Sequence, residues 1–161
     1  MIKLYQFPIS HYCEKVRWAL EFKGIEYETI NLLPGLHTKT TKKIAPKSSV
    51  PLLVDGEQVV QNSSDILDYL EAQYPEPTLT PDLPEHEAQA QAWEEYADKE
   101  IGPAVRRLCY NTLLNHPDKV KPIFTAGRSP IVLSSPNVAR RVSGDFVYSG
   151  KSPVFWKKGR W

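Results

Sequence analysis

Residues 2–24 read IKLYQFPISHYCEKVRWALEFKG, and this stretch decides the fold. Residues 2–7 alternate in polarity, which predicts a short strand that Pro8 ends. A helix is expected next, with Gly24 at its C-terminal end, where glycine is common. The apolar positions of this helix, three and four residues apart, are Cys13, Val16 and Leu20. The stretch is therefore a strand followed directly by an amphipathic helix.

Two chemically active side chains, Ser10 and Cys13, lie three residues apart at the start of the expected helix. Ser10 falls at or next to the N-cap, a position that serine favours whatever its other roles. The N-terminal end of a helix carries partial positive charge and stabilises an anion, and a thiolate is an anion. The pattern therefore places a hydroxyl and a thiol where thiolate chemistry is favoured.

The composition is that of one globular domain, or of one small domain with part of another. The chain has 161 residues, 41% of them hydrophobic, and a net charge of +1, which gives no argument for nucleic-acid binding. The charge is uneven, since residues 1–126 hold 13 Lys/Arg and 18 Asp/Glu, whereas residues 127–161 hold 7 and 1. Residues 127–161 also lack a consistent period, so we interpret them as an atypical basic tail that is disordered, forms weak strands, or is an out-of-register or substituted C-terminus.

Several classes of protein are disfavoured. Cys13 and Cys109 are too few and too far apart for a disulfide framework. The chain has no run of about 18 apolar residues that would span a membrane and no signal segment before the first strand. The histidines lack metal-ligand spacing, and there is no glycine-rich phosphate loop. We therefore expect a cytoplasmic protein with reduced thiols and no metal.

The remaining pattern predicts a small α/β domain over residues 1–75. Period-two alternation and the strand–helix–strand order predict that the first two strands pair in parallel. Asp55-Gly56 is the strongest hairpin signal in the chain, so the last two strands are expected to be antiparallel. The expected strands are residues 2–7, 25–32, 50–54 and 58–61. A short helix is expected within residues 36–48. A further helix is expected to begin at Asn62, and its apolar side carries Ile66, Leu67, Leu70 and Tyr74.

A cluster of prolines separates this domain from a helical region. Pro75, Pro77, Pro81 and Pro84 predict an extended linker over residues 76–84. Residues 85–126 are expected to form a partial all-helical domain, in which Gly102-Pro103 should kink or split the helix. A short further element is expected after His116. The recurring apolar residues are Trp93, Ala97, Ile101, Val105 and Leu108, and we expect apolar surface to be exposed around Trp93 and Val105.

The residues quoted so far carry a likeness to a known family. The run from Ser10 to Leu20, then Val50-Pro51, then Asn62-Ser63 at a helix start, resemble the cytosolic glutathione transferases. The resemblance implies a thioredoxin-like domain of order β-α-β-α-β-β-α with a mixed four-stranded sheet, followed by an all-helical domain that is truncated here. It also implies glutathione as a co-substrate, a small apolar electrophile as the second substrate, and a homodimer joined across both domains.

The resemblance assigns roles to individual residues. Ser10 matches the catalytic hydroxyl of the serine-type classes, which lowers the pKa of the glutathione thiol. Val50-Pro51 matches a cis-proline corner whose backbone binds the cysteinyl part of glutathione. Asn62-Ser63 matches the pair that binds the γ-glutamyl carboxylate at a helix N-terminus. Asp65 is either a ligand for the ammonium group of glutathione or a capping residue that forms a weak capping box with Asn62.

A cation for the glycine carboxylate of glutathione is expected between residues 36 and 48. Lys39 and Lys47 are the candidates, although His37, Lys42 and Lys43 share this segment and a solvated basic face explains any one of them. Arg17 is expected to be a structural ion-pair partner. Cys13 is interpreted as a core residue that could act in redox chemistry, and Cys109 as a core residue.

Three functions therefore stay open. The first is glutathione transfer to small apolar electrophiles through Ser10. The second is a non-catalytic glutathione-binding module that lacks a complete second-substrate pocket. The third is a thiol-disulfide or dehydroascorbate-type reductase that works through Cys13. The basic aromatic ending, residues 155–161, also suits nucleic acid or an anionic membrane surface, but seven terminal residues are a weak basis, and we expect no nucleic-acid partner.

Overall fold

The computed structural model describes residues 1–81, 83–113 and 115–116. The first seven elements follow the expected order of strands and helices, whereas the predictions for residues 117–161 lie outside the described ranges. The strands are β1 (Ile2–Gln6), β2 (Tyr27–Asn31), β3 (Leu52–Asp55) and β4 (Gln58–Gln61). The helices are α1 (His11–Phe22), α2 (His37–Ile44), α3 (Ser63–Gln73), α4 (Pro84–Tyr96), the π-helical turn η1 (Ala97–Ile101) and α5 (Gly102–Leu113).

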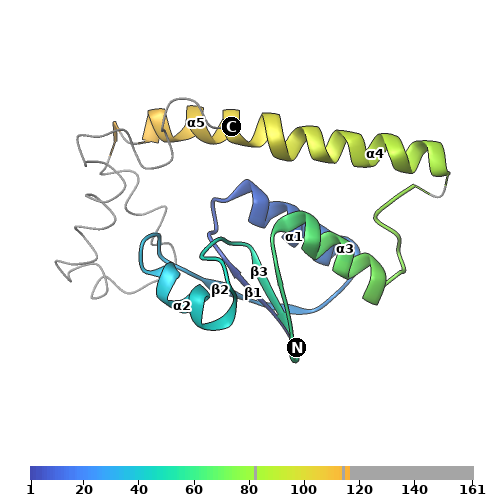
Figure 1. Cartoon of the computed structure of the whole chain (residues 1–161), viewed down its shortest axis with the longest axis horizontal. Helices are drawn as coiled ribbons and strands as arrows, with labels where there is room; N and C mark the ends of the chain where they lie inside the picture. The colour runs from blue at the N-terminus through green and yellow to red at the C-terminus, as the bar shows by residue number, and fades with distance from the viewer. Residues whose placement is uncertain (82, 114, 117–161) are drawn as a thin grey trace.

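The four strands form one mixed sheet in the order β2-β1-β3-β4 (Figure 1). β1 pairs with β2 in parallel, whereas β3 is antiparallel to both β1 and β4, as the sequence predicts. The carboxyl ends of β1, β2 and β4 therefore meet the amino end of β3 at one edge of the sheet. The chain leaves the sheet at this edge after Gln6 and after Gln61. It enters β3 from the same edge at Leu52.

The hydrophobic core lies where α1 and α3 pack against one face of the sheet, and α2 lies on the other side (Figure 1). The expected apolar positions of α1 are buried, and Ala19 joins them. On α3, Ile66 and Leu70 are fully buried, while Leu67 and Tyr74 pack at the margin. The main core cluster consists of Ile2, Leu4, Val16, Ala19, Leu20, Leu53, Ile66 and Leu70.

The end of α1 is anchored by a glycine and by a buried lysine. Gly24 has a φ of +64°, a conformation that glycine adopts without steric cost. The buried Lys23 side chain donates to the carbonyl oxygens of Tyr74 (2.6 Å) and Pro77 (2.8 Å) and pairs with the Glu71 carboxylate (2.9 Å). These contacts hold the proline-rich segment after α3 against the end of α1.

The helix is irregular next to Gly102-Pro103, where the sequence predicts a kink or a split. α4, η1 and α5 follow one another without a gap and are drawn as one long helix over the domain (Figure 1). The irregularity is a π-helical turn immediately before Gly102, whose N–H donates to the carbonyl of Ala97, five residues earlier. A wider turn at this point absorbs the missing N–H and the bulk of Pro103, which an uninterrupted α-helix could not do without strain.

This long helix buries little of its own surface. No side chain of α4 is buried, and Gly102 is the buried residue of α5 within the described part of the chain. The expected exposure around Trp93 and Val105 is confirmed, at 64% and 44%. Cys109 is exposed, so its interpretation as a core residue is wrong. The apolar side of the helix is not the side that contacts the α/β domain.

No helix in the described ranges is both long enough and apolar enough to cross a membrane.

Candidate functional site

Ser10 occupies the N-cap of α1, as predicted, but its hydroxyl does not cap the helix. The Ser10 backbone is extended, its N–H donates to the Phe7 carbonyl (3.0 Å), and its own carbonyl accepts from the N–H of Glu14 (2.9 Å). The Ser10 side chain is instead a hydrogen-bond partner of the Cys13 thiol. The half-buried Ser10 hydroxyl therefore lies at the positive end of the helix dipole with the Cys13 thiol as its partner.

Cys13 is fully buried beneath the first turn of α1. Burial raises the pKa of its thiol, and this effect outweighs the opposing hydrogen bonds from Ser10 and from the Phe7 backbone and the charge of Arg17. A buried thiol with a raised pKa is a poor nucleophile. This geometry matches the interpretation of Cys13 as a core residue and does not favour a redox role.

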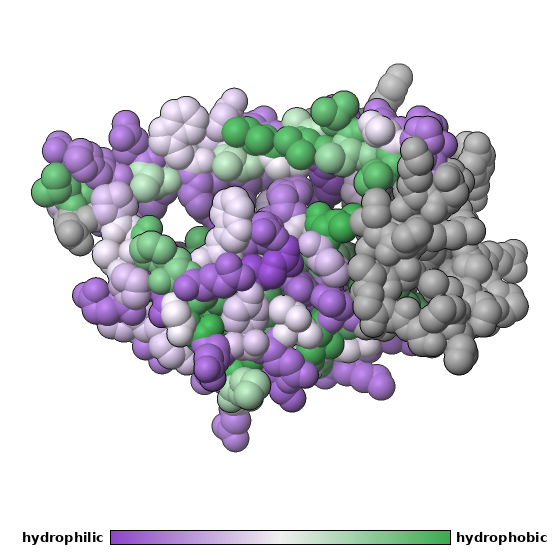
Figure 2. Space-filling view, turned by 180° about the vertical axis from the view of Figure 1, so that it is seen from behind, coloured by the Kyte–Doolittle hydropathy of each residue, from purple (hydrophilic) through white to green (hydrophobic). Residues whose placement is uncertain are grey.

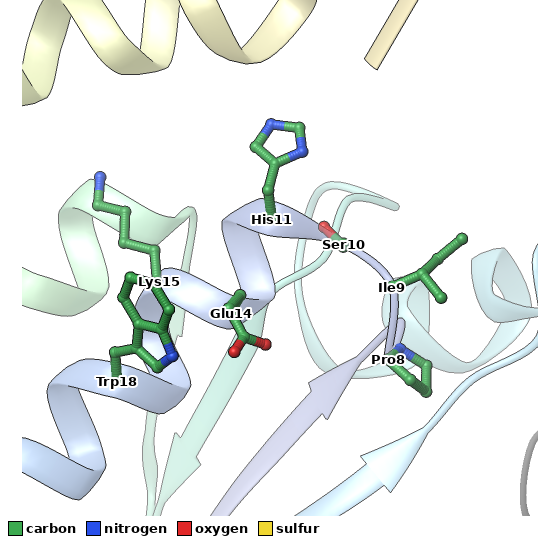
Figure 3. A pocket seen from close by; sticks show the side chains of 7 residues that line it. All are labelled: Pro8, Ile9, Ser10, His11, Glu14, Lys15 and Trp18. Atoms are coloured by element: carbon green, nitrogen blue, oxygen red, sulfur yellow. The ribbon is translucent and has the colours of Figure 1, made fainter. Parts of the chain in front are cut away.

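An open cavity of about 510 Å³ lies over the turn that leads into α1 (Figure 3). Figure 3 shows Ser10 where the chain enters the helix, with the His11 ring pointing away from the body of α1 toward the helix above it. Ser10 is the predicted site residue that lines this cavity. The lining residues are Pro8, Ile9, Ser10, His11, Glu14, Lys15 and Trp18.

His11 and Tyr12 connect this turn to the long helix, a role that the sequence analysis missed. The Tyr12 hydroxyl donates to the carbonyl oxygen of Asp98 in η1 (2.9 Å). A Cβ atom on Gly102 would lie 2.6 Å from the Tyr12 hydroxyl and 3.0 Å from Nε2 of His11, so only glycine allows this approach. Burial lowers the pKa of His11, as does the charge of Arg106, while Asp98 opposes both.

A polar cluster joins α1, α3 and α4 beside this contact. Lys15 pairs with Glu94 and with Asp98 (3.2 Å), and the Ser64 hydroxyl bonds both carboxylates at 2.8 Å. The four side chains come from three helices, so the cluster fixes the long helix over the start of α1. Glu94 and Asp98 are four residues apart and therefore lie on one side of the helix. This spacing is the sequence signal from which the polar cluster could have been predicted.

The Val50–Pro51 peptide bond is cis, as the resemblance implies. Pro51 precedes β3 at the shared sheet edge, and its carbonyl accepts a hydrogen bond from the N–H of Asn62 (3.3 Å). Asn62 is the N-cap of α3 with a φ of +107°, and its side chain makes no capping bond. The predicted capping box between Asn62 and Asp65 is therefore absent, since the Asn62 backbone lacks the extended conformation typical of an N-cap residue, and both residues are exposed.

Ser63 is the most informative of the predicted site residues. Its side chain is 1% exposed at the start of α3, and its hydroxyl has no hydrogen-bond partner among the residues that the structure describes. Buried hydroxyls without partners are rare because they lose their hydration without compensation. The first N–H groups of α3 lie beside it, and free N–H groups at a helix start suit an anion.

The two lysines proposed to bind the glycine carboxylate of glutathione, Lys39 and Lys47, lie in different parts of the structure. Lys47 lies near the same sheet edge, because the Gln61 side chain bonds both the N–H (3.2 Å) and the carbonyl (2.8 Å) of its backbone. Lys39 is exposed on α2. Arg17 is the structural partner that was expected, since it bonds Glu14, Gln6 and the Pro8 carbonyl around the turn that holds Ser10.

Within the described ranges, no group of three or more His, Cys, Asp or Glu side chains is arranged so that it could hold a metal ion.

Known proteins resemble the α/β part of the chain. Residues 4–78 match the family model of the glutathione S-transferase N-terminal domain. The chain is 46% identical over 83 residues to glutathione S-transferase Z2 of Arabidopsis thaliana, a match that covers 50% of this chain and 37% of that protein.

Solved structures extend the likeness to the fold. A glutathione S-transferase from Rhodospirillum rubrum is 28% identical with a TM-score of 0.58, over 62% of this chain and 46% of that one. A maleylacetoacetate isomerase from Anaeromyxobacter dehalogenans, solved with bound GSH, is 27% identical with a TM-score of 0.53, over 64% of this chain and 51% of that one. The chain thus spans well under two thirds of these relatives. Residues 4–78 therefore resemble the N-terminal domain of the glutathione S-transferases both in sequence and in fold.

Proposed function

We propose that the chain binds glutathione at the sheet edge shared by Ser10, Val50-Pro51 and Ser63, and transfers it to small apolar electrophiles. The orphan hydroxyl of Ser63 carries this proposal. Among the described residues this buried hydroxyl has no hydrogen-bond partner, and it lies at the start of a helix, where the resemblance expects the γ-glutamyl carboxylate of glutathione. A carboxylate bound there would satisfy the serine and the helix N-terminus together.

Ser10 is proposed to activate the thiol. A free thiol has a pKa of ~8.5, so only a few per cent is thiolate at neutral pH. A hydroxyl that donates to sulfur contributes ~1.5–3 kcal/mol to the charged form, which lowers the thiol pKa by ~1–2 units. The Ser10 hydroxyl, which does not cap the helix, would turn from the Cys13 thiol to donate to the glutathione sulfur, at the end of the helix that favours an anion.

The proposed reaction is a nucleophilic displacement. With 1-chloro-2,4-dinitrobenzene as the test substrate, the thiol proton passes to solvent, the thiolate sulfur forms a bond to the ring carbon, and chloride leaves. No covalent bond to the protein forms. His11 and the turn into α1 line the cavity next to Ser10 in which the electrophile is proposed to bind. We propose in addition that the chain acts in the cytoplasm, as its resemblance to the cytosolic glutathione transferases implies.

The test is calorimetric titration with glutathione, followed by chlorodinitrobenzene conjugation on the same sample. Ser63→Ala should weaken glutathione binding ~10-fold or more, since it removes a hydrogen bond to a charged group. Ser64→Ala is the matched control, because the hydroxyl of Ser64 bonds Glu94 and Asp98 instead. Ser10→Ala should leave binding near its original strength and reduce kcat/KM ~10-fold or more at pH 6.5.

Other outcomes identify the alternatives. Binding without turnover would support the non-catalytic glutathione-binding module. Disulfide reductase activity that Cys13→Ser abolishes would support the Cys13 reductase. The absence of any glutathione binding would contradict all three functions.

A further inference from the structure

The side of the long helix that faces α1 carries an arginine next to the cavity over Ser10. Large apolar side chains gather along this helix (Figure 2), and those in its described part are exposed. The side toward α1 instead presents the carbonyl of Asp98 and the bare Cα of Gly102. Arg106 follows Gly102 by one α-helical turn, so the two residues lie on the same side of α5.

Two observations place the charge of Arg106 beside His11. A Cβ atom on Gly102 would lie 3.0 Å from Nε2 of His11, so the imidazole reaches α5 one turn before Arg106. Burial lowers the pKa of His11, and the positive charge of Arg106 lowers it further. Burial raises the pKa of Tyr12, and the same charge opposes this rise. The guanidinium group therefore lies close to a residue that lines the cavity.

Arg106 and His11 have hydrogen-bond donors to spare. Among the residues that the structure describes, the exposed Arg106 makes neither a hydrogen bond nor an ion pair. His11 makes no hydrogen bond there either, and its ring contact is with Tyr12, at 4.0 Å between the ring centroids. Figure 3 shows the His11 ring directed toward the helix above the cavity. We name the pair of Arg106 and His11 the anion subsite.

The carboxylates near the cavity are committed to other cations. Asp98, whose charge also reaches His11, pairs with Lys15 (3.2 Å). Glu14, which lines the cavity, pairs with Arg17. Neither acid neutralises Arg106, so the cation at this end of the cavity has no counter-charge within the described ranges.

The wall of the cavity below the anion subsite is apolar. It includes Pro8, Ile9, which is 41% exposed, and Trp18, which is 67% exposed. Aromatic rings bury a large apolar area against such side chains, and pockets of this kind combine apolar walls with a few polar groups that fix orientation. The planar guanidinium group of an arginine binds a carboxylate through two parallel hydrogen bonds. The combination suits an aromatic ring that carries a carboxylate.

We propose that the electrophile is an aromatic acid whose ring lies against Ile9 and Trp18 and whose carboxylate binds to the anion subsite. This inference rests on the proposed function and specifies its substrate, which is apolar apart from one anionic group. The displacement itself is unchanged: the thiol proton passes to solvent, the sulfur–carbon bond forms, and chloride leaves with the electrons of its bond. The carboxylate takes no part in the bond changes and acts by orienting the ring.

The first test compares 4-chloro-3,5-dinitrobenzoate with the neutral 4-chloro-3,5-dinitrobenzamide. Arg106→Gln should lower kcat/KM for the benzoate at least ~10-fold more than for the benzamide, because it removes charged hydrogen bonds that only the benzoate makes. Each substrate is compared between variant and original chain, so the difference in intrinsic reactivity cancels. Arg106→Lys keeps the charge without the planar fork and should restore part of the loss.

Arg107→Gln is the matched control. Arg107 is also exposed and adjacent in sequence, but it lies about 100° around the helix from Arg106. Its loss should leave kcat/KM for both substrates unchanged. Circular dichroism of each variant checks that it is folded.

Binding of an unreactive acid tests the anion subsite without turnover. Calorimetric titration should show that 4-nitrobenzoate binds more tightly than 4-nitrobenzamide, and that Arg106→Gln weakens the benzoate at least ~10-fold. Added sodium chloride should weaken the benzoate as well, because Arg106 is exposed and its charge is screened by salt.

The outcomes separate this inference from the proposed function. Glutathione binding and turnover with equal losses for both substrates in Arg106→Gln would overturn the inference and leave the proposed function standing. A loss as large in Arg107→Gln would also overturn it, since the preference would then come from a diffuse positive surface. Binding of 4-nitrobenzoate that depends on Arg106, without any binding of glutathione, would support the anion subsite and contradict the proposed function. The absence of both kinds of binding would contradict both.

Discussion

The α/β domain and the long helix bury opposite kinds of side chain. Every buried hydrophobic residue in the described ranges lies between Ile2 and Leu70. The long helix is attached through charged and hydroxyl side chains, by the Lys15 cluster and by Tyr12. Apolar burial is the dominant favourable term in folding, whereas partly exposed polar contacts contribute little each. The two regions should therefore differ in how far single substitutions lower stability.

A matched pair of leucine truncations has the largest expected effect. Leu53 is fully buried between β1 and β4, so Leu53→Ala should lower the free energy of unfolding by ~2–5 kcal/mol through lost burial and the cavity it leaves. Leu108→Ala, on a side chain that is 68% exposed, should change it by less than ~0.5 kcal/mol. Urea unfolding of both variants, at a protein concentration where the chain is monomeric, makes the comparison. Equal losses would mean that the helix is buried in solution.

Removal of the counter-charge of the buried Lys23 should have the next largest effect on the free energy of unfolding. Its side chain is 0% exposed and bonds two carbonyls and Glu71, which is 27% exposed. Glu71→Gln leaves a buried ammonium without its counter-charge and should cost ~2 kcal/mol, less than a fully buried pair because Glu71 reaches solvent and Lys23 keeps its carbonyl partners. Urea unfolding at pH 7 measures this loss, and Glu95→Gln, in an exposed pair with Lys99, is the control that should cost almost nothing.

The same pair predicts a pH dependence. Desolvation would raise the pKa of Glu71, but hydrogen bonds from Lys23, Thr78 and the Leu79 N–H, together with the charge of Lys23, outweigh it and lower the pKa from its usual 4.5 to about 2. Because the folded pKa is depressed, the stabilisation is present above about pH 4.5 and is lost as pH falls toward 2. The difference in stability between the original chain and Glu71→Gln should shrink in that window. A constant difference would contradict the assignment.

The α/β fold could be predicted because each of its elements carries a local signal. Alternation in residues 2–7, the Asp55-Gly56 turn and Gly24 act within a few residues, and the sheet order follows from them through short connections. The long helix could be predicted as a helix but not in its orientation. The exposure of Trp93 and Val105 was predicted, whereas the exposure of Cys109 was not. The side of the helix that packs is set by Asp98 and Gly102, through contacts with Tyr12 and His11 that lie 86 to 91 positions earlier in the sequence.

In the candidate site too, some features follow from local sequence signals and others depend on distant contacts. Ser10 and Ser63 could be located from helix starts, because capping rules act locally. The roles of their side chains could not, since neither hydroxyl caps its helix in the structure. Tyr12 and Lys15 were missed because their importance depends on where a distant helix lies. Local patterns therefore predict position, and only tertiary contacts reveal which hydroxyl is left without a partner.

A matched pair of lysine substitutions tests the attachment of the long helix. Lys15→Met should weaken the contact by ~1 kcal/mol, since the cluster has several bonds but is partly exposed. Amide hydrogens of η1 and α5 should then exchange ~5-fold faster, while those of β1 and β3 stay protected. Lys99→Met removes an exposed pair on the same helix and should leave exchange unchanged. Equal effects of the two variants would mean that the helix is held by contacts other than this cluster.

The smallest expected effect has a sign that depends on context. Alanine at position 102 favours a helix over glycine by ~1 kcal/mol, but its Cβ would meet the Tyr12 hydroxyl at 2.6 Å and Cζ at 3.1 Å. Gly102→Ala should therefore be slightly destabilising, by ~0.5–1 kcal/mol, because overpacking exceeds the gain in propensity. In a Tyr12→Ala background both contacts disappear and only the end of the His11 side chain, whose Nε2 lies 3.0 Å from the Cβ position, has to shift, so the same substitution should cost less or become stabilising. A double-mutant cycle measured by urea unfolding gives the coupling. If Gly102→Ala stabilises both backgrounds equally, α5 does not approach Tyr12 in solution. The Tyr12 contact would then no longer explain how the long helix is attached to the α/β domain.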